Sequence, residues 1–248
     1  MQRPWQENFD FYEAAAKTGR ALVNIDLAAA PHVPLKSHPV RMQFRVKMLQ
    51  PREDGLRSNE EMDALFDLED RLVGAMEQQL DAIYIGRGVA YGHTEFFFYV
   101  PREKHDAKPS LGSLAPYALG MLTEDDPEWD RYFELFPSPF AMQLIMNRRL
   151  LTQMEASGDQ LSVPRTVDHL ARFKSEDEAK GAGDALLKAG FTVDAANKDE
   201  NDGLWSIEFH RIEAIDGGAA DHFTSEIFEL ISPFDGDYDG WGSELQKN

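Results

Sequence analysis

The clearest pattern in the chain is an alternation of apolar and polar side chains between Val40 and Met48. Every second residue is apolar, and the residues between them are Arg41, Gln43, Arg45 and Lys47. Successive side chains of a strand point to opposite faces, so the alternation predicts a half-buried strand with a basic outer face. A helix is expected next, because apolar residues recur at helical spacing beyond Ser58, and Ser58 with Glu61 fits a capping box.

The rest of the first half contains further strand and helix patterns. Strands are predicted at residues 21–26, 81–87, 94–100 and 129–136, and a weaker helix at residues 110–121. The run Phe96–Tyr99 is apolar on both faces, which predicts a strand that is covered on both sides. Apolar residues from Phe140 to Met154 mark another helix, and Ser157–Gln160 is expected to be a linker.

The second half repeats nearly the same order of elements. Strands are predicted near residues 167–173, 191–195, 205–209 and 238–241, with helices near 175–190 and 223–231. This βαββαβ order is typical of ferredoxin-like modules. The expected fold class is therefore α+β, with two ferredoxin-like modules, antiparallel sheets and helices on one face. The expected domains are residues 1–158 and residues 162–248.

Length and net charge indicate how many domains the chain can form and which partners its surface attracts. The 248 residues are enough for two domains that each bury a core. The net charge is −19, and residues from 160 onward carry −11 of it, with 19 acidic and 8 basic side chains. Such a surface repels phosphate backbones, so no direct nucleic-acid binding is expected. A basic protein segment, by contrast, is attracted.

The sequence also bears on location and redox chemistry. Cysteine is absent, which removes disulfides, thiolate nucleophiles and cysteine-based zinc sites. No signal peptide is visible behind Met1, and no apolar stretch approaches the roughly 20 residues of a membrane span. We therefore expect a protein with no membrane contact in a reducing compartment, and the cytoplasm is the simplest location.

The stretch Asp235–Gly242 differs from an ordinary surface turn. It reads Asp-Gly-Asp-Tyr-Asp-Gly-Trp-Gly, with three carboxylates at alternate positions beside two aromatic rings and three glycines. Its part Tyr238–Gly242, at the end of the strand–helix–hairpin–helix–strand order, resembles the regulator of ribonuclease E activity B family. The first module resembles the uncharacterised domain that is fused ahead of this regulator-like domain in some bacterial proteins.

The resemblance implies a non-catalytic, acidic regulator that binds ribonuclease E and restrains it, and it implies no function for the first module. A patch of acids and aromatic rings suits contact with a basic partner segment. The residues expected at this contact are Asp235, Asp237, Tyr238, Asp239, Gly240 and Trp241. The known regulators are single small domains, so the fused form leaves room for a different partner.

The same run has an alternative interpretation as a calcium loop. Asp235, Asp237, Asp239 and Gly240 match the beginning of an EF-hand. Position 12 of that motif requires a bidentate glutamate, and here it is Gln246, so no metal and no cofactor is expected. In a third interpretation the acids are solvated turn residues, and the two aromatic side chains pack one end of the module.

Other candidate chemistry is weaker. Residues 86–92 are rich in glycine but join two strands, so a hairpin turn is expected rather than a phosphate loop, which leads into a helix. His93 beside Glu95, and His210 near Glu208, are candidate acid–base pairs on strands. No nucleophile elbow or zinc-binding histidine motif is present. The strands also lack the basic-Gly-aromatic pattern of an RNA-recognition module, since Thr94–Val100 has the aromatic residues but no basic leader. No catalytic residue is therefore expected.

The leading hypothesis is a non-catalytic protein that binds and inhibits ribonuclease E or a related RNA-processing protein. Two alternatives stay open. The first is a general protein-interaction or small-ligand-binding protein with no link to ribonucleases. The second is an enzyme that uses a cleft between the two modules, around Tyr91 and His93.

Overall fold

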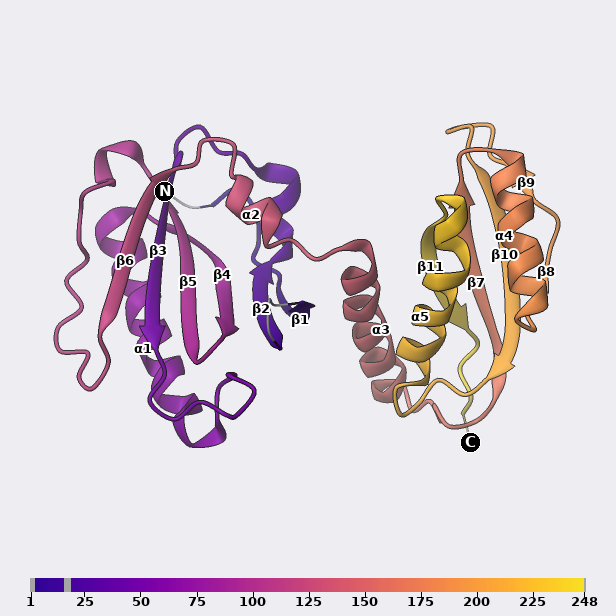
Figure 1. Cartoon of the computed structure of the whole chain (residues 1–248), viewed down its shortest axis with the longest axis horizontal. Helices are drawn as coiled ribbons and strands as arrows, with labels where there is room; N and C mark the ends of the chain where they lie inside the picture. Colours follow the sequence, from indigo (N-terminus) through magenta and orange to yellow (C-terminus); the bar gives the residue numbers. More distant parts are fainter. Residues whose placement is uncertain (1–2, 16–18, 248) are drawn as a thin grey trace. The chain divides into compact units, whose positions relative to one another are not determined.

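The computed structural model describes residues 3–15 and 19–247 of the chain. These residues form two compact units, an N-terminal unit that ends at Ser138 and a C-terminal unit that begins at Pro139. Each unit is built on an antiparallel sheet with helices packed against it (Figure 1). The predicted fold class, α+β with two ferredoxin-like modules, is confirmed. None of the helices among these residues is long and apolar enough to cross a membrane.

The sheet of the N-terminal unit has the strand order β1-β2-β4-β5-β3-β6, and each neighbouring pair is antiparallel. Its strands are β1 (Phe9–Ala15), β2 (Arg20–Asp26), β3 (Val40–Lys47), β4 (Ile83–Ala90), β5 (His93–Val100) and β6 (Leu119–Asp125). Helix α1 (Asn59–Leu80) connects β3 to β4, and the short η2 (Arg102–Lys104) follows β5. Strands β3 to β6 have the ferredoxin-like order, but residues 105–118 replace its second helix and contain no regular element.

Helix α1 is held against the sheet by an apolar stripe. Leu65, Leu72 and Met76 are fully buried and belong to one core cluster with residues of β3 and β5, among them Phe44 and Phe98. Burying a side chain of this kind contributes roughly 1.5–3 kcal/mol, so the stripe accounts for most of the attachment of α1.

The start of α1 differs from the prediction. Ser58 is the N-cap residue, but its side chain makes no capping hydrogen bond, so the predicted capping box is wrong. Glu61 instead accepts hydrogen bonds from the backbone N–H groups of Leu49 and Gln50, each at 2.7 Å. The buried carboxylate therefore ties the chain after β3 to the first turn of α1.

The opposite face of the N-terminal sheet is also covered. Trp129 is fully buried, stacks on Tyr99 with ring centroids 3.8 Å apart, and donates from Nε1 to the carbonyl oxygen of His38 at 3.0 Å. The short helix α2 (Asp130–Glu134) follows Trp129, and η1 (Leu27–His32) packs in the same cluster. The N-terminal sheet thus has helical segments on both faces, an addition to the expected arrangement on one face.

Two predictions for the N-terminal unit are wrong. Residues 129–136 contain α2 rather than a strand, because Trp129 has a positive φ of 59° that ends any extended backbone. The closing strand is β6, part of which lies inside the segment predicted as a weak helix. Since β6 is at the edge of the sheet and most of its residues are exposed, it lacks the alternation that identifies a strand.

The C-terminal unit begins with α3 (Pro139–Ala156) and continues in the predicted βαββαβ order (Figure 1). Its further elements are β7 (Arg165–Phe173), α4 (Glu176–Lys188), β8 (Thr192–Val193), β9 (Asn197–Lys198), β10 (Trp205–Glu213), α5 (Ala219–Ile231), η3 (Ser232–Phe234) and β11 (Asp237–Ser243). The sheet order is β11-β7-β10-β8, and β9 pairs with β10. The predicted capping box of Ser175 and Glu178 at the start of α4 is confirmed.

The division between the units differs from the predicted domains 1–158 and 162–248. Helix α3 was expected to belong to the first domain, but it packs within the C-terminal unit. Its Asn147 is fully buried and donates to Thr224 Oγ1 and Asp221 Oδ1 of α5, at 3.0 Å each. The apolar spacing of a helix shows which of its faces is buried, but it does not show which of two cores that face meets.

Gly86 provides a test of the N-terminal sheet. It lies at a bulge of β4 with φ of 145°, and a Cβ there would clash with the carbonyl oxygen of Asn24 and lie 2.9 Å from Cα of Ile25. Gly86→Ala is expected to lower the free energy of unfolding by about 2–3 kcal/mol, because neither backbone atom can move without disturbing β2. Urea unfolding checks this, with Gly88→Ala as the control, since a Cβ at Gly88 meets nothing closer than 3.7 Å. Equal stability of the two variants would contradict the pairing of β2 with β4.

Candidate protein-binding surface

The predicted contact residues lie on and just before β11, the end strand of the C-terminal sheet. Asp235, Asp237 and Asp239 are exposed, whereas Trp241 is half-buried and Tyr238 is only 6% exposed. The structure therefore separates the two kinds of side chain that the sequence places together. The acids face solvent, and the aromatic rings face the interior of the unit.

A β-bulge at Asp239 produces this separation. Tyr238 and Gly240 pair with adjacent residues of β7, so Asp239 is an extra residue without an opposite partner. In a regular strand Tyr238 and Trp241, which are three residues apart, would point to opposite faces. The extra residue brings both rings to the core face. Gly240 has φ of 113°, a backbone conformation that residues with a Cβ rarely adopt.

Tyr238 is fixed in the core by a buried histidine. Its hydroxyl lies 2.8 Å from Nδ1 of His169, and its ring meets Phe228 edge-on with the ring centroids 5.7 Å apart. Burial raises the pKa of the Tyr238 hydroxyl well above its ordinary value, and the charge of Glu213 raises it further. The ring therefore holds β11 in place and is not exposed to a partner, in contrast to the predicted contact at Tyr238.

His169 is neutral in this environment. Its pKa is lowered to about 3, because burial penalises the imidazolium and the cation of Arg211 repels it. The ring stacks on Phe209 with the centroids 5.1 Å apart. Its Nε2 lies 3.9 Å from Glu213 Oε1, which is too long for a hydrogen bond, and a neutral ring forms no ion pair there.

Trp241 joins β11 to two helices. Its Nε1 donates to Oδ1 of Asn147 in α3 at 2.8 Å, and its ring packs edge-on against Phe223 of α5 with centroids 5.3 Å apart. Because Asn147 also bonds to α5, one buried amide connects α3, α5 and β11. The indole remains half-buried and lines cavities beside β11, so part of it is open to a ligand.

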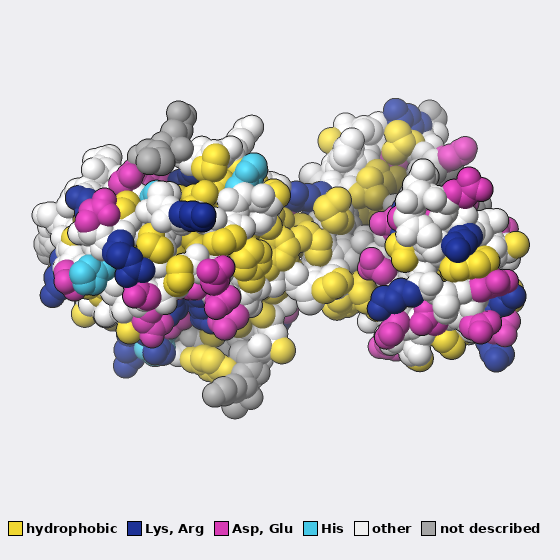
Figure 2. All heavy atoms as spheres, turned by 90° about the horizontal axis from the view of Figure 1, so that it is seen from above, with side chains coloured by type: hydrophobic (Ala, Val, Ile, Leu, Met, Phe, Trp, Pro, Cys, Tyr) yellow, Lys and Arg dark blue, Asp and Glu magenta, His cyan; other side chains and the backbone are white. Residues whose placement is uncertain are grey.

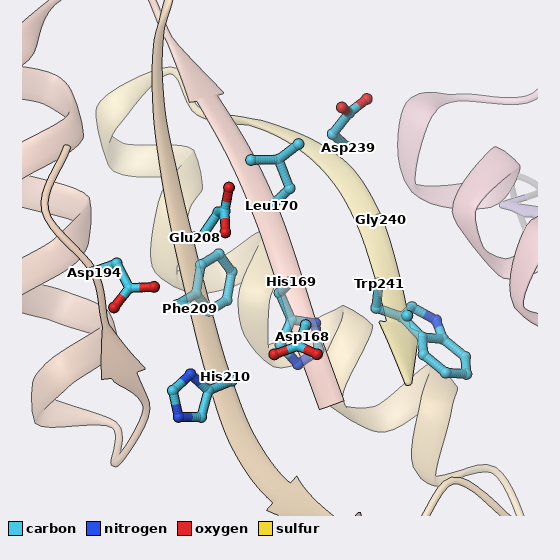
Figure 3. A pocket seen from close by; sticks show the side chains of 11 residues that line it. Asp168, His169, Leu170, Asp194, Glu208, Phe209, His210, Asp239, Gly240 and Trp241 are labelled. Carbon is cyan, nitrogen blue, oxygen red and sulfur yellow. The ribbon is translucent and has the colours of Figure 1, made fainter. Parts of the chain in front are cut away.

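The outer face of the C-terminal sheet, which is the side away from α4 and α5, is acidic. Its exposed carboxylates come from β7, the residue after β8, β10 and β11, and they are Asp168, Asp194, Glu208 and Asp239. They line a shallow depression of about 290 Å³ together with Leu170 (Figure 3). Arg172 of β7 pairs with Asp239 at 3.3 Å and with Asp202 at 3.0 Å, so its charge is compensated locally.

Three of these acids were not predicted as contact residues. Asp168, Asp194 and Glu208 belong to three separate segments, and the sheet order alone brings them together. The available signal was the alternation in β7 and β10, which places Asp168 and Glu208 on the polar side of each strand. Glu208 and His210, a candidate acid–base pair, both line the depression (Figure 3).

The alternative calcium loop has no support in the structure. Asp237 and Asp239 lie on an extended strand rather than in a loop that wraps around an ion. Within residues 3–15 and 19–247, no group of three or more histidine, aspartate or glutamate side chains is placed to hold a metal ion.

Two candidate sites of the N-terminal unit, the pair of His93 with Glu95 and the glycine-rich residues 86–92, lie in one β-hairpin. Nδ1 of His93 lies 2.9 Å from the carbonyl oxygen of Tyr91, and Glu95 pairs with Arg45 at 3.5 Å rather than with His93. Strands β4 and β5 pair on either side of the turn at Tyr91, as predicted for residues 86–92.

Comparison with protein families agrees with the two units. Residues 7–136, more than half of the chain, match the model of a family of unknown function (DUF695), and the chain belongs to this family. Residues 144–243 match the model described as Regulator of ribonuclease activity B. Both resemblances found in the sequence are thereby confirmed, and the second supports a general role in regulating ribonuclease activity. This match begins inside α3, which agrees with the place of that helix in the C-terminal unit.

Other comparisons add no functional argument. No curated protein is similar enough to the chain to count as a match. The crystal structure of an unknown protein from Galdieria sulphuraria aligns with 84% of this chain and 99% of its own, at 11% identity and a TM-score of 0.22. A similarity at that score carries no conclusion about this protein.

The pair of His169 and Tyr238 makes stability depend on pH. The pKa of His169 is about 3 in the folded chain and 6.5 as an ordinary value, so below pH 6.5 the unfolded state binds a proton that the folded state does not. Stability therefore falls as the pH falls, and the loss between pH 6.5 and pH 5 is about 1.5 kcal/mol. His169→Phe combined with Tyr238→Phe removes this dependence and leaves neither partner of the hydrogen bond unpaired.

Urea unfolding at the two pH values tests this expectation. Carboxylates elsewhere contribute equally to both proteins, so the wild type is expected to lose about 1.5 kcal/mol more than the double variant. An equal loss in the two proteins would show that His169 is not held neutral in the folded chain.

Proposed function

We propose that the C-terminal unit binds ribonuclease E, or a related RNA-processing protein, through a basic segment of that partner and lowers its cleavage activity. The observation that carries the proposal is the match of residues 144–243 to regulators of ribonuclease activity. The chain acts by binding and is not itself a catalyst. The proposed place of action is the cytoplasm, and a sequence without cysteine suits a reducing compartment.

The charge of the C-terminal unit supports a basic partner. Residues 139–248 contain 21 acidic and 10 basic side chains, a net charge of −11. Figure 2 shows many of the acids at the surface of this unit. Complementary charge speeds the encounter of two proteins and fixes their orientation. The same charge repels the phosphates of RNA, so the regulator acts on the enzyme and does not cover its RNA.

The outer face is the part of this surface that we assign to the partner. It is the sheet face opposite α4 and α5, and Asp168, Glu208 and Asp239 are exposed on it. Leu170 adds apolar area at the depression between them. Acids around an apolar centre fit the aliphatic stems and charged ends of lysine and arginine side chains.

Neutralising the outer face is expected to weaken binding. Asp168→Asn with Glu208→Gln removes two exposed carboxylates and nearly preserves side-chain size. Exposed charge pairs contribute on the order of 0.2–1 kcal/mol each, so the loss of two should lower the affinity about two- to thirtyfold at low salt. Calorimetry with the host's own ribonuclease E at two salt concentrations measures this. The matched control is Asp184→Asn with Glu229→Gln, which makes the same charge change on exposed positions of α4 and α5.

The possible outcomes test the identity of the partner and the location of the contact independently. Wild-type binding is expected to be saturable and to weaken as salt is added. If both double variants lose affinity equally, net charge rather than the outer face accounts for binding. No binding at low salt by a chain that is verified as folded would contradict ribonuclease E as the partner.

A further inference from the structure

A groove runs between α3 and the free side of β11, and we call it the α3–β11 groove. It consists of two adjoining cavities of about 410 Å³ and about 240 Å³, which share Leu150, Gln153 and Trp241. Its walls combine apolar side chains with the polar Gln143, Arg149 and Gln153 of α3. The apolar part is accessible, since Met146 is 49% exposed and Leu245 is 43% exposed. The groove lies on the side of β11 opposite to β7.

The lining residues show that the groove follows an edge and not a face of the sheet. Residues 239–243 of β11 are consecutive, and all of them line one of the two cavities. Residues on one face of a strand would alternate, so the backbone itself must border the groove. Gly242 is exposed, and a Cβ added to it would meet nothing within 4 Å. The backbone is therefore uncovered at this point.

The outer edge of β11 has backbone N–H and C=O groups that can bind a further strand. Among the described residues β11 pairs with β7 and with no other strand. Alternate N–H and C=O groups of an end strand point away from its neighbour, and such a row is a template for a further strand. Extended peptides bind many domains in this way, with main-chain hydrogen bonds for affinity and side-chain pockets for specificity.

We propose that an extended segment of a protein partner adds to β11 as a further strand and fills the α3–β11 groove. This inference rests on the proposed function, in which the C-terminal unit holds a partner, and it states how the segment is held. Side chains of the added strand alternate between two environments. One set meets Met146, Leu150 and Trp241, and the other set lies on the outer face beside Asp237 and Asp239.

The two environments define the chemistry of the segment. Apolar residues at every second position suit the groove, and lysine or arginine residues suit the positions between them. Charge complementarity favours this occupant on the β11 side, because residues 235–244 contain four acidic side chains and no lysine or arginine. Arg149 lines the larger cavity from α3, where the apolar side chains of the segment are placed. A second copy of β11 would bring these acids against one another, and RNA has no peptide edge and is repelled by them.

The probe for this proposal is a synthetic ten-residue peptide of alternating valine and lysine, titrated into the full chain by calorimetry. Its control is a peptide of the same composition with the valines and lysines in separate blocks. Two further peptides carry N-methyl groups on alternate amides, one on the valines and one on the lysines. We expect the alternating peptide to bind at least tenfold more tightly than the blocked one, and one N-methylated peptide to lose that affinity while the other keeps it.

Matched variants locate the site. Met146→Lys replaces an apolar side chain of the groove wall with a charged one and is expected to weaken peptide binding at least tenfold. Leu187→Lys makes the same change at a position that is 53% exposed on α4, and it should leave binding unchanged. Equal effects of the two N-methylated peptides, equal effects of the two variants, or saturable binding of oligouridylate in place of the peptide would each overturn the proposal.

The same variants distinguish this proposal from the proposed function. If ribonuclease E binds the wild type and Met146→Lys equally well, the groove is not its docking site, and the proposed function stands. If the alternating peptide binds as expected and ribonuclease E does not, the groove holds a strand from another basic protein.

Discussion

The β-bulge at Asp239 is the constraint on which the surface of the C-terminal unit depends. One extra residue changes which face the rest of the strand presents, so Tyr238 and Trp241 both point inward although they are three residues apart. Both rings then anchor an end strand that would otherwise have few contacts. With both rings on the core side of the strand, the acids on either side of Tyr238 remain on the solvent side. Because its aromatic residues hold β11 in place, the carboxylates of Asp237 and Asp239 have defined positions on the solvent side.

The buried amide of Asn147 extends this arrangement to α3. It accepts a hydrogen bond from the indole of Trp241 and donates to α5, so its hydrogen-bonding groups are satisfied without water. If Trp241 pointed to the outer face, this bond could not form, and α3 would lose its polar attachment to β11. The bulge therefore places Trp241 where its indole contacts α3 and lines the groove beside β11.

The sequence predicted elements well where a periodic signal was strong. Strand β3 alternates over its whole length, and α4 begins with a true capping box at Ser175. Prediction failed where the signal was weak or absent, as in the exposed edge strand β6 and at Trp129, whose positive φ no pattern reveals. The sequence also could not show that α3 belongs to the C-terminal unit. Asn147 is polar in the sequence, and nothing there indicates that it is buried against Thr224 of α5.

The candidate site shows the same limits. The acids on and just before β11 were found because they lie within five residues of one another in the chain. Asp168 and Glu208 lie 40 residues apart, and only the pairing of β7 with β10 places them on one face. Packing of Tyr238 and Trp241 at one end of the module was one of the interpretations left open by the sequence. A two-residue period cannot show the extra residue that puts both rings on the same face.

The N-terminal unit belongs to a family of unknown function, and the contact with a ribonuclease is assigned to the C-terminal unit. The most direct test is hydrogen exchange of the full chain, measured alone and saturated with ribonuclease E. The account predicts that the protection gained on binding is concentrated in β7, β10 and β11. Protection confined to the N-terminal unit, or a complex in which these three strands exchange as in the free chain, would contradict it.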